Sequence, residues 1–177
     1  SLLPTLLSRG QRIHLDGMSP KEALAELAAR CGGSGGEAER ALEAANGSVG
    51  EAERLLSPES AENRKKACEI LLYALSGKSY ELSKALLLPK YKREKLYDIL
   101  DSLLLLLLQR QKEKYGFGAQ PFPPAGELAA LLASAGKRSL ARAGAAVISC
   151  MTALEASANV NAAASRLAVE LIVAASK

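Results

Sequence analysis

Six consecutive leucines at positions 103–108 constrain the fold of this chain more than any other feature. Asp101 lies shortly before the run and Arg110 shortly after it, and a membrane-spanning helix needs about 20 apolar residues. The run is therefore too short to cross a bilayer. Leu96 and Ile99 extend it upstream at helical spacing. We expect a long helix with a wide apolar face, contacted on several sides within a helical domain.

Leucine and alanine dominate the apolar content. Hydrophobic residues make up 49% of the 177 residues, whereas aromatic residues make up 4% and Trp is absent. Leucine and alanine lose little free energy on entering a helix, so the composition predicts an all-α fold. A chain of this length forms one large domain or two small ones.

Cysteine and histidine usage argues against metal and disulfide chemistry. Cys31, Cys68 and Cys150 are odd in number and widely spaced, and His14 is the single histidine. Neither a disulfide framework nor a zinc site is predicted, and a reducing cytoplasm fits best. With one histidine, the sequence does not support a catalytic pair of a histidine base and a nucleophile. We therefore interpret His14 as a partly buried residue without a catalytic role.

Residues 17–57 differ from the rest of the chain in their closely spaced helix start and stop signals. Ser19 and Glu22 form a predicted capping box around Pro20, and Ser48 and Glu51 form another. Between them, a helix over about 37–45 is expected to end at Asn46-Gly47. These signals predict a bundle of three short helices that depend on mutual packing for stability.

Residues 58–177 show longer helical periods. The spacing predicts five or six helices, with a Gly- and Pro-rich loop over 115–126 and the last helices near 127–134, 138–157 and 160–175. Asn159 and Asn161, at the start of the last helix, are candidates for capping and for interhelical hydrogen bonds, with capping favoured.

Basic charge gathers in this second region. The net charge is −2 over residues 1–57 and +6 over residues 58–177. The basic residues form two clusters in the sequence, Lys90, Lys92, Arg93 and Lys95, and then Lys137, Arg138 and Arg142. Both clusters could face DNA phosphates, but a net charge of +4 for the whole chain is modest, so a solvated surface is favoured.

Gly77-Lys78-Ser79 matches the end of a phosphate-binding loop. Leu72 stands where the earlier glycine of that loop is required, and a helix instead of a strand is expected before it. We therefore interpret Gly77 as a helix C-cap and Ser79 as the next N-cap. No catalytic site is predicted from the motifs described so far.

The start of the chain resembles the Ser-Arg-Cys motif that closes the ATPase core of clamp-loader subunits. The stretch reads Leu3-Pro4-Thr5-Leu6-Leu7-Ser8-Arg9-Gly10-Gln11, with Gly10 in the Cys position. Residues 46–56 resemble the last helix of the lid domain in that family. Residues 158–162 resemble the start of the final helix of the bacterial delta-prime subunit. The chain is thus similar to a bacterial DNA polymerase III clamp-loader subunit, most like delta-prime.

This resemblance implies that three segments of the chain have different roles. Residues 1–16 would be the tail end of an AAA+ ATPase core that lies upstream, residues 17–57 a lid domain, and residues 58–177 a helical collar domain. The collar would assemble the heteropentamer that loads the sliding clamp onto primed DNA. Partners would be other loader subunits, with the clamp and DNA contacted indirectly, and no membrane.

Arg9 is the one site residue that the resemblance implies. In the family, the arginine of this motif contacts ATP bound to a neighbouring subunit, where a guanidinium stabilises charge that develops in the transition state. Arg9, flanked by Ser8 and Gly10, is therefore a candidate arginine finger acting in trans, and a surface arginine closing a turn is the alternative. No cofactor is expected within these residues, although the chain would be part of a polymerase holoenzyme, a nucleotidyltransferase complex.

Two alternatives stay open. An ATP-hydrolysing, tau- or gamma-like subunit of the same loader would share these features. Residues 36–56 also resemble the second half of a ubiquitin-associated module, a helical protein-interaction unit, although Gly17-Met18-Ser19 lacks the aromatic residue of that module's binding loop.

Overall fold

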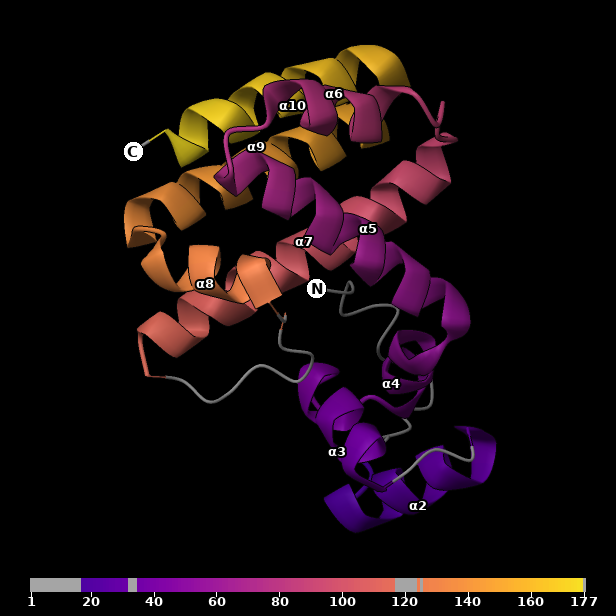
Figure 1. Ribbon diagram of the computed structural model, residues 1–177. Coiled ribbons are helices and arrows are strands. Elements are labelled where there is room, and N and C mark those ends of the chain that lie inside the picture. Colours follow the sequence, from indigo (N-terminus) through magenta and orange to yellow (C-terminus); the bar gives the residue numbers. More distant parts are fainter. Residues whose placement is uncertain (1–16, 32–34, 117–123, 125, 177) are drawn as a thin grey trace, which may run out of the picture. The chain divides into compact units, whose positions relative to one another are not determined.

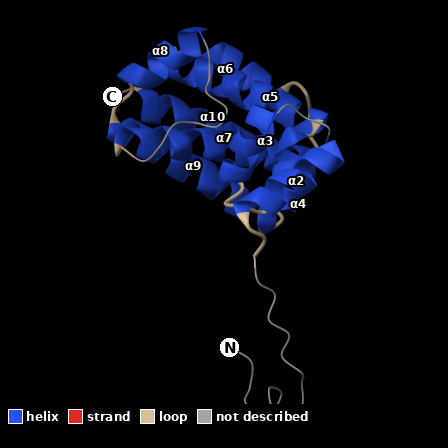
Figure 2. Cartoon of the chain, turned by 90° about the horizontal axis from the view of Figure 1, so that it is seen from below, coloured by secondary structure: helices blue, strands red, loops and turns tan. Residues whose placement is uncertain are grey.

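The computed structural model describes residues 17–31, 35–116, 124 and 126–176. Every regular element within these ranges is a helix, which confirms the predicted all-α class (Figures 1 and 2). The helices are α2 (Pro20–Cys31), α3 (Gly35–Ala44), α4 (Val49–Leu56), α5 (Pro58–Leu75), α6 (Ser79–Leu87), α7 (Arg93–Lys114), α8 (Gly126–Ser134), α9 (Lys137–Glu155) and α10 (Val160–Ala175).

The chain forms two compact units, Ser1–Glu53 and Arg54–Lys177. The first contains α2, α3 and the first turn of α4, and the second contains the remaining helices. Their assignment to a lid and a collar stays a prediction. No described helix is both long enough and apolar enough to span a membrane.

Capping interactions define the helix ends of the first unit. The Ser19 backbone N–H donates to the Glu22 carboxylate at 2.9 Å, and the Glu22 N–H donates to the Ser19 hydroxyl at 3.4 Å. This reciprocal pair is the predicted capping box. The Ser19 hydroxyl also donates to the Glu22 carboxylate at 2.7 Å, and this bond, followed by the backbone bond, lowers the pKa of Glu22. At α4 the Glu51 N–H donates to the Ser48 hydroxyl at 3.4 Å, so Ser48 is also a cap as predicted.

Alanine fills most of the first unit's interior. The buried apolar residues among those described are Ala23, Leu27, Ala38, Ala41, Leu42, Ala45 and Ala52. α3 begins at Gly35, two residues before the predicted start, and ends at Ala44. Asn46 and Gly47 follow with positive φ angles of 49° and 83°, so the chain leaves the helix through the left-handed conformation that Asn-Gly favours.

Leucine fills the interior of the second unit. α7 packs against α5 and α9, while α10 packs against α9, α6 and α5. Within the leucine run, Leu103, Leu106 and Leu107 are buried and Leu108 is 45% exposed. The expectation of a helix contacted on more than one side is confirmed. Among the described residues of this unit, six helices, α5 to α10, follow α4, which is the upper end of the predicted number.

Side-chain bonds join elements that are distant in the sequence. At the start of α7, the Arg93 guanidinium donates to the Ser157 hydroxyl and to the Ala158 carbonyl, each at 3.3 Å, in the turn between α9 and α10. The buried Ser139 hydroxyl in α9 donates to the Ala174 carbonyl in α10 at 2.6 Å. The Arg93 bonds tie the α9–α10 turn to the start of α7, and the Ser139 bond ties the start of α9 to the end of α10.

Candidate functional site

The residues of the predicted arginine-finger motif, Ser8, Arg9 and Gly10, lie outside the described residues, as does His14. Their roles stay predictions.

The Gly77-Lys78-Ser79 segment is a turn between α5 and α6. Gly77 has a φ of +68°, and the Lys78 N–H donates to the Tyr73 carbonyl at 2.9 Å, which closes the end of α5. The interpretation as a helix boundary is therefore correct, with Ser76 as the C-cap and Gly77 just beyond it. The predicted cap of α6 is wrong by one residue. Lys78 holds the N-cap position, because Ser79 already has helical geometry, and no side chain caps this helix.

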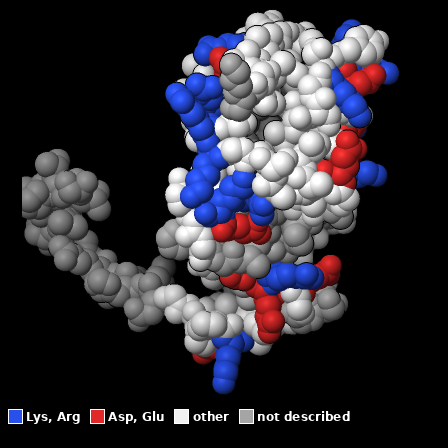
Figure 3. All heavy atoms as spheres, turned by 60° about the vertical axis from the view of Figure 1, so that its left-hand side comes forward, with Lys and Arg blue, Asp and Glu red and all other residues white. Residues whose placement is uncertain are grey.

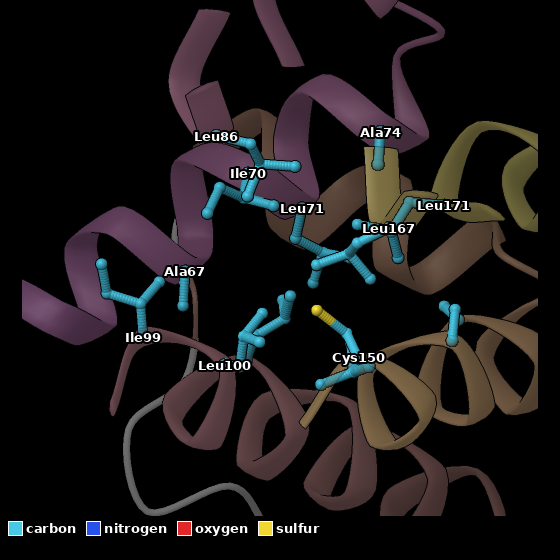
Figure 4. Close-up of a cluster of buried hydrophobic side chains, with 14 of the residues drawn as sticks. Ala67, Ile70, Leu71, Ala74, Leu86, Ile99, Leu100, Cys150, Leu167 and Leu171 are labelled. Atoms are coloured by element: carbon cyan, nitrogen blue, oxygen red, sulfur yellow. The ribbon is translucent and has the colours of Figure 1, made fainter. Parts of the chain in front are cut away.

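The cysteine side chains are separate from one another and from acidic clusters. Cys31 is exposed, Cys68 is partly buried and Cys150 is buried, and none of the three forms a disulfide. Burial raises the pKa of Cys150 to about 11 and also raises the pKa of Cys68. Both thiols are therefore protonated at neutral pH and poorly nucleophilic. Figure 4 shows the Cys150 sulfur directed into the cluster that includes Leu71, Leu100 and Leu167.

Several carboxylates in the described ranges form ion pairs with arginine or lysine. Asp101 pairs with Arg54 at 3.0 Å, and Glu53 pairs with Arg30 at 3.4 Å. No group of three or more His, Cys, Asp or Glu side chains in the described ranges is arranged to hold a metal ion.

An apolar groove runs between α6 and α10. Its volume is about 360 Å³. The groove is lined by Ser79, Ser83, Leu87, Ser165, Ala168, Val169, Ile172 and Val173. Val169 and Val173 lie one turn apart on α10 and are 64% and 62% exposed. Together with the small serine side chains opposite, they leave room for a side chain from another protein to enter.

Sequence reasoning missed this groove, although a signal was present. Ser79, Ser83 and Leu87 recur every four residues and so share one face of α6. Val169 and Val173 have the same spacing on α10. The pattern shows which residues share a face of each helix, but the pairing of α6 with α10 requires the tertiary structure.

Asn159 caps α10. Its side-chain carbonyl accepts a hydrogen bond from the Ala162 N–H at 3.1 Å, so the prediction of a capping role is confirmed. The Asn161 backbone carbonyl accepts from the Ser165 hydroxyl at 2.8 Å within the same helix.

The two basic clusters differ in how their charges are used. In the first, Arg93 bonds to the α9–α10 turn, and Lys95 pairs with Glu59 at 3.2 Å. In the second, Lys137, Arg138 and Arg142 form no ion pair with any residue that the structure describes. The first cluster is therefore partly structural, and the second is available for other charges.

The second cluster also lies at an unfavourable end of its helix. Lys137 and Arg138 occupy the first turn of α9, where no acidic residue is present, whereas each of the helices α2 to α8 has an acidic residue in its first turn. The N-terminus of a helix carries partial positive charge, so each exposed cation there costs about 0.3–1 kcal/mol at low ionic strength. The sequence thus places positive charge where helix stability disfavours it.

A scan against protein-family models finds no match for this chain, and a search of curated proteins finds no significant match.

Proposed function

We propose that the chain is part of a subunit of the bacterial DNA replication clamp loader, most like delta-prime, and that its second unit is the collar that joins the subunit to its neighbours. The observation that carries the proposal is the exposed apolar face of α10 beside the α6 groove. A collar domain must bury its own core and still offer apolar surface to adjacent subunits. Val169 and Val173 provide such a surface.

The remaining parts of the proposal follow from the same resemblance. The first unit is the lid, residues 1–16 end the ATPase core, and Arg9 reaches ATP in a neighbouring subunit. The protein works in the cytoplasm, where the sliding clamp and primed DNA are contacted through the assembled loader. The motif Ser8-Arg9-Gly10 and the helical content of both units support this assignment.

Reconstitution tests the proposal. The chain is mixed with the other clamp-loader subunits of the same organism, and complex mass is measured by light scattering after size exclusion. We expect a complex of defined stoichiometry that is lost in the Val169→Glu/Val173→Glu variant, because two carboxylates cannot be buried unpaired in an interface. Leu108→Glu/Ile148→Glu is the matched control, since it adds the same charge at two exposed apolar residues, on α7 and α9, that lie outside the groove. Failure of the wild-type chain to join a complex contradicts the proposal. If the control variant loses the complex to the same extent as the groove variant, the groove is not the contact surface.

The ATP-hydrolysing loader subunit is the nearest alternative, because its expected lid and collar are the same. The coding sequence upstream of Ser1 distinguishes the two. A complete Gly-x-x-x-x-Gly-Lys-Ser/Thr loop there favours the ATP-hydrolysing subunit, and an ATPase-like pattern without that loop favours delta-prime.

A ubiquitin-associated-like function has one observation in its favour. The first unit carries an apolar groove of about 530 Å³, lined in part by Met18, Leu24 and Leu42, and Met18 is 57% exposed. Titration of the chain with ubiquitin, followed by amide chemical shifts, tests this alternative. Shifts confined to these groove residues support it, and unchanged spectra at millimolar ubiquitin exclude it.

A further inference from the structure

The structure brings an aromatic ring to the second basic cluster. Tyr115, at the end of α7, is 61% exposed, and the Lys137 ammonium lies 4.1 Å from the centre of its ring. The two residues are 22 positions apart in the sequence, so the second cluster, which contains no aromatic residue in the sequence, has one beside it in space. We call Tyr115, Lys137, Arg138 and Arg142 the α9 basic patch.

Two further contacts hold the end of α7 against the start of α9. The Arg110 guanidinium donates to the Leu132 carbonyl at 3.3 Å, and the Lys114 ammonium donates to the Ala135 carbonyl. Both acceptors lie in or next to α8, directly before α9. The relative position of Tyr115 and the three cations is therefore built into the packing of the second unit.

The patch presents concentrated positive charge to solvent. Lys137, Arg138 and Arg142 are exposed and have no ion pair with a described residue. Figure 3 shows lysine and arginine side chains gathered on the face that carries the left-hand side of Figure 1, where α7 ends and α9 begins. A polyanion placed here would meet three unpaired cations and the positive end of the α9 dipole together.

We propose that the α9 basic patch binds single-stranded nucleic acid, with the phosphate backbone along Lys137, Arg138 and Arg142 and a base against Tyr115. Cations along a strand combined with an exposed aromatic platform are the two elements of sequence-tolerant single-strand binding. A base in a duplex is already stacked and cannot use the ring. Ala141, the exposed residue between Arg138 and Arg142 on α9, is too small to anchor the patch in a lipid bilayer. This inference goes beyond the proposed function and does not depend on it.

The first experiment measures the salt dependence of binding. The probe is a fluorescein-labelled 20-mer of deoxythymidine, and binding to the 177-residue chain is followed by anisotropy between 25 and 200 mM NaCl. Three phosphate contacts on a single strand contribute about −2 to the slope of log K against log salt. We therefore expect Lys137→Gln/Arg138→Gln/Arg142→Gln to have a slope shallower by about 2 and affinity at least about tenfold lower at 25 mM NaCl.

A matched variant controls for net charge. Lys84, Lys90 and Lys92 are also exposed and without an ion pair to a described residue, and they lie elsewhere in the second unit. Lys84→Gln/Lys90→Gln/Lys92→Gln removes the same charge, and we expect it to keep the wild-type slope to within about 0.5. Equal losses in the two triple variants overturn the proposal, because binding would then follow net charge alone.

The second experiment tests the ring. Tyr115→Ala should weaken binding by about fivefold or more with the salt slope unchanged, whereas Tyr115→Phe should retain the wild-type affinity, because stacking needs the ring and not the hydroxyl. Wild-type affinity in Tyr115→Ala overturns the role of the ring. Circular dichroism melts of each variant establish that the helices are intact.

Competitors decide the class of ligand. Unlabelled 20-mer should displace the probe at least about tenfold more effectively than a 20-base-pair duplex at equal phosphate concentration. Vesicles of phosphatidylserine and phosphatidylcholine should not displace it at the same concentration of negative charge. Equal or better displacement by duplex or by vesicles overturns the assignment to single strands.

Discussion

The two units bury side chains of different size. Five of the seven buried apolar residues described in the first unit are alanines, whereas the largest fully buried side chains of the second unit are leucines and isoleucines. The helices also differ in length. Helices α2, α3 and α4 have 12, 10 and 8 residues, whereas α5, α7 and α9 in the second unit have 18, 22 and 19 residues. Burial of alanine removes little apolar area from water. Stability in the first unit therefore depends more on helix ends, and in the second unit more on the core.

A core truncation gives the largest expected effect and tests this contrast directly. Leu100 is fully buried in α7, and Leu100→Ala should lower the free energy of unfolding of the second unit by about 2–5 kcal/mol. The first unit should be unchanged. Calorimetry, with amide hydrogen exchange to assign each transition, measures both. A loss shared equally by the two units would show that they unfold together and would remove the basis of the comparison.

Alkaline pH gives an intermediate effect that is confined to the second unit. The pKa of Cys150 is raised from 9.0 to about 11 in the folded state, so the folded protein binds this proton more tightly than the unfolded chain. Its contribution is fully present below pH 9 and is lost as the pH rises towards 11. At pH 10 the loss is on the order of 1 kcal/mol.

Cys150→Ala isolates this contribution. Cys68, Lys66, Tyr73, Tyr91 and Tyr97 also have raised pKa values, but their effects are common to both proteins and cancel in the difference. Urea unfolding at pH 7 and pH 10 should show a smaller alkaline loss in the variant. Equal losses would place the Cys150 thiol in contact with solvent, against its observed burial.

Helix caps give the smallest change in free energy but the sharpest contrast between the units. Ser19→Ala and Asn159→Ala each remove a side-chain acceptor from a helix N-terminus and should each cost about 1 kcal/mol. The same loss shifts the melting temperature more in a smaller unit, because its unfolding entropy is smaller. We expect a decrease of roughly 8 °C for the first unit and roughly 4 °C for the second. Matching shifts would mean that one cooperative transition covers both units.

Local features were predictable from the sequence, and pairings between distant residues were not. The helical class and the caps at Ser19, Ser48 and Asn159 depend on periodicity and on bonds within four residues. They can therefore be predicted from the sequence alone. The exception at Ser79 shows the limit of such rules, since one dihedral angle decides which residue is the cap.

The candidate surfaces depend on tertiary packing. The contact of Arg93 with Ser157 and Ala158 spans more than 60 residues and converts one predicted basic cluster into a structural element. The contact of Lys137 with Tyr115 gives the other cluster an aromatic neighbour. Neither pairing has a local signal, because each is set by the packing of α7 against α9.

The packing of α10 has a consequence for protein synthesis. α10 covers parts of α5, α6 and α9, and the Ala174 carbonyl accepts the bond from Ser139. The ribosome makes these elements in chain order, so the first unit can fold once residue 53 has emerged. The surface of α6 that packs against α10 waits uncovered while about 70 further residues are translated. The nascent second unit is thus the part of this chain most exposed to aggregation, and the part that a ribosome-associated chaperone would bind.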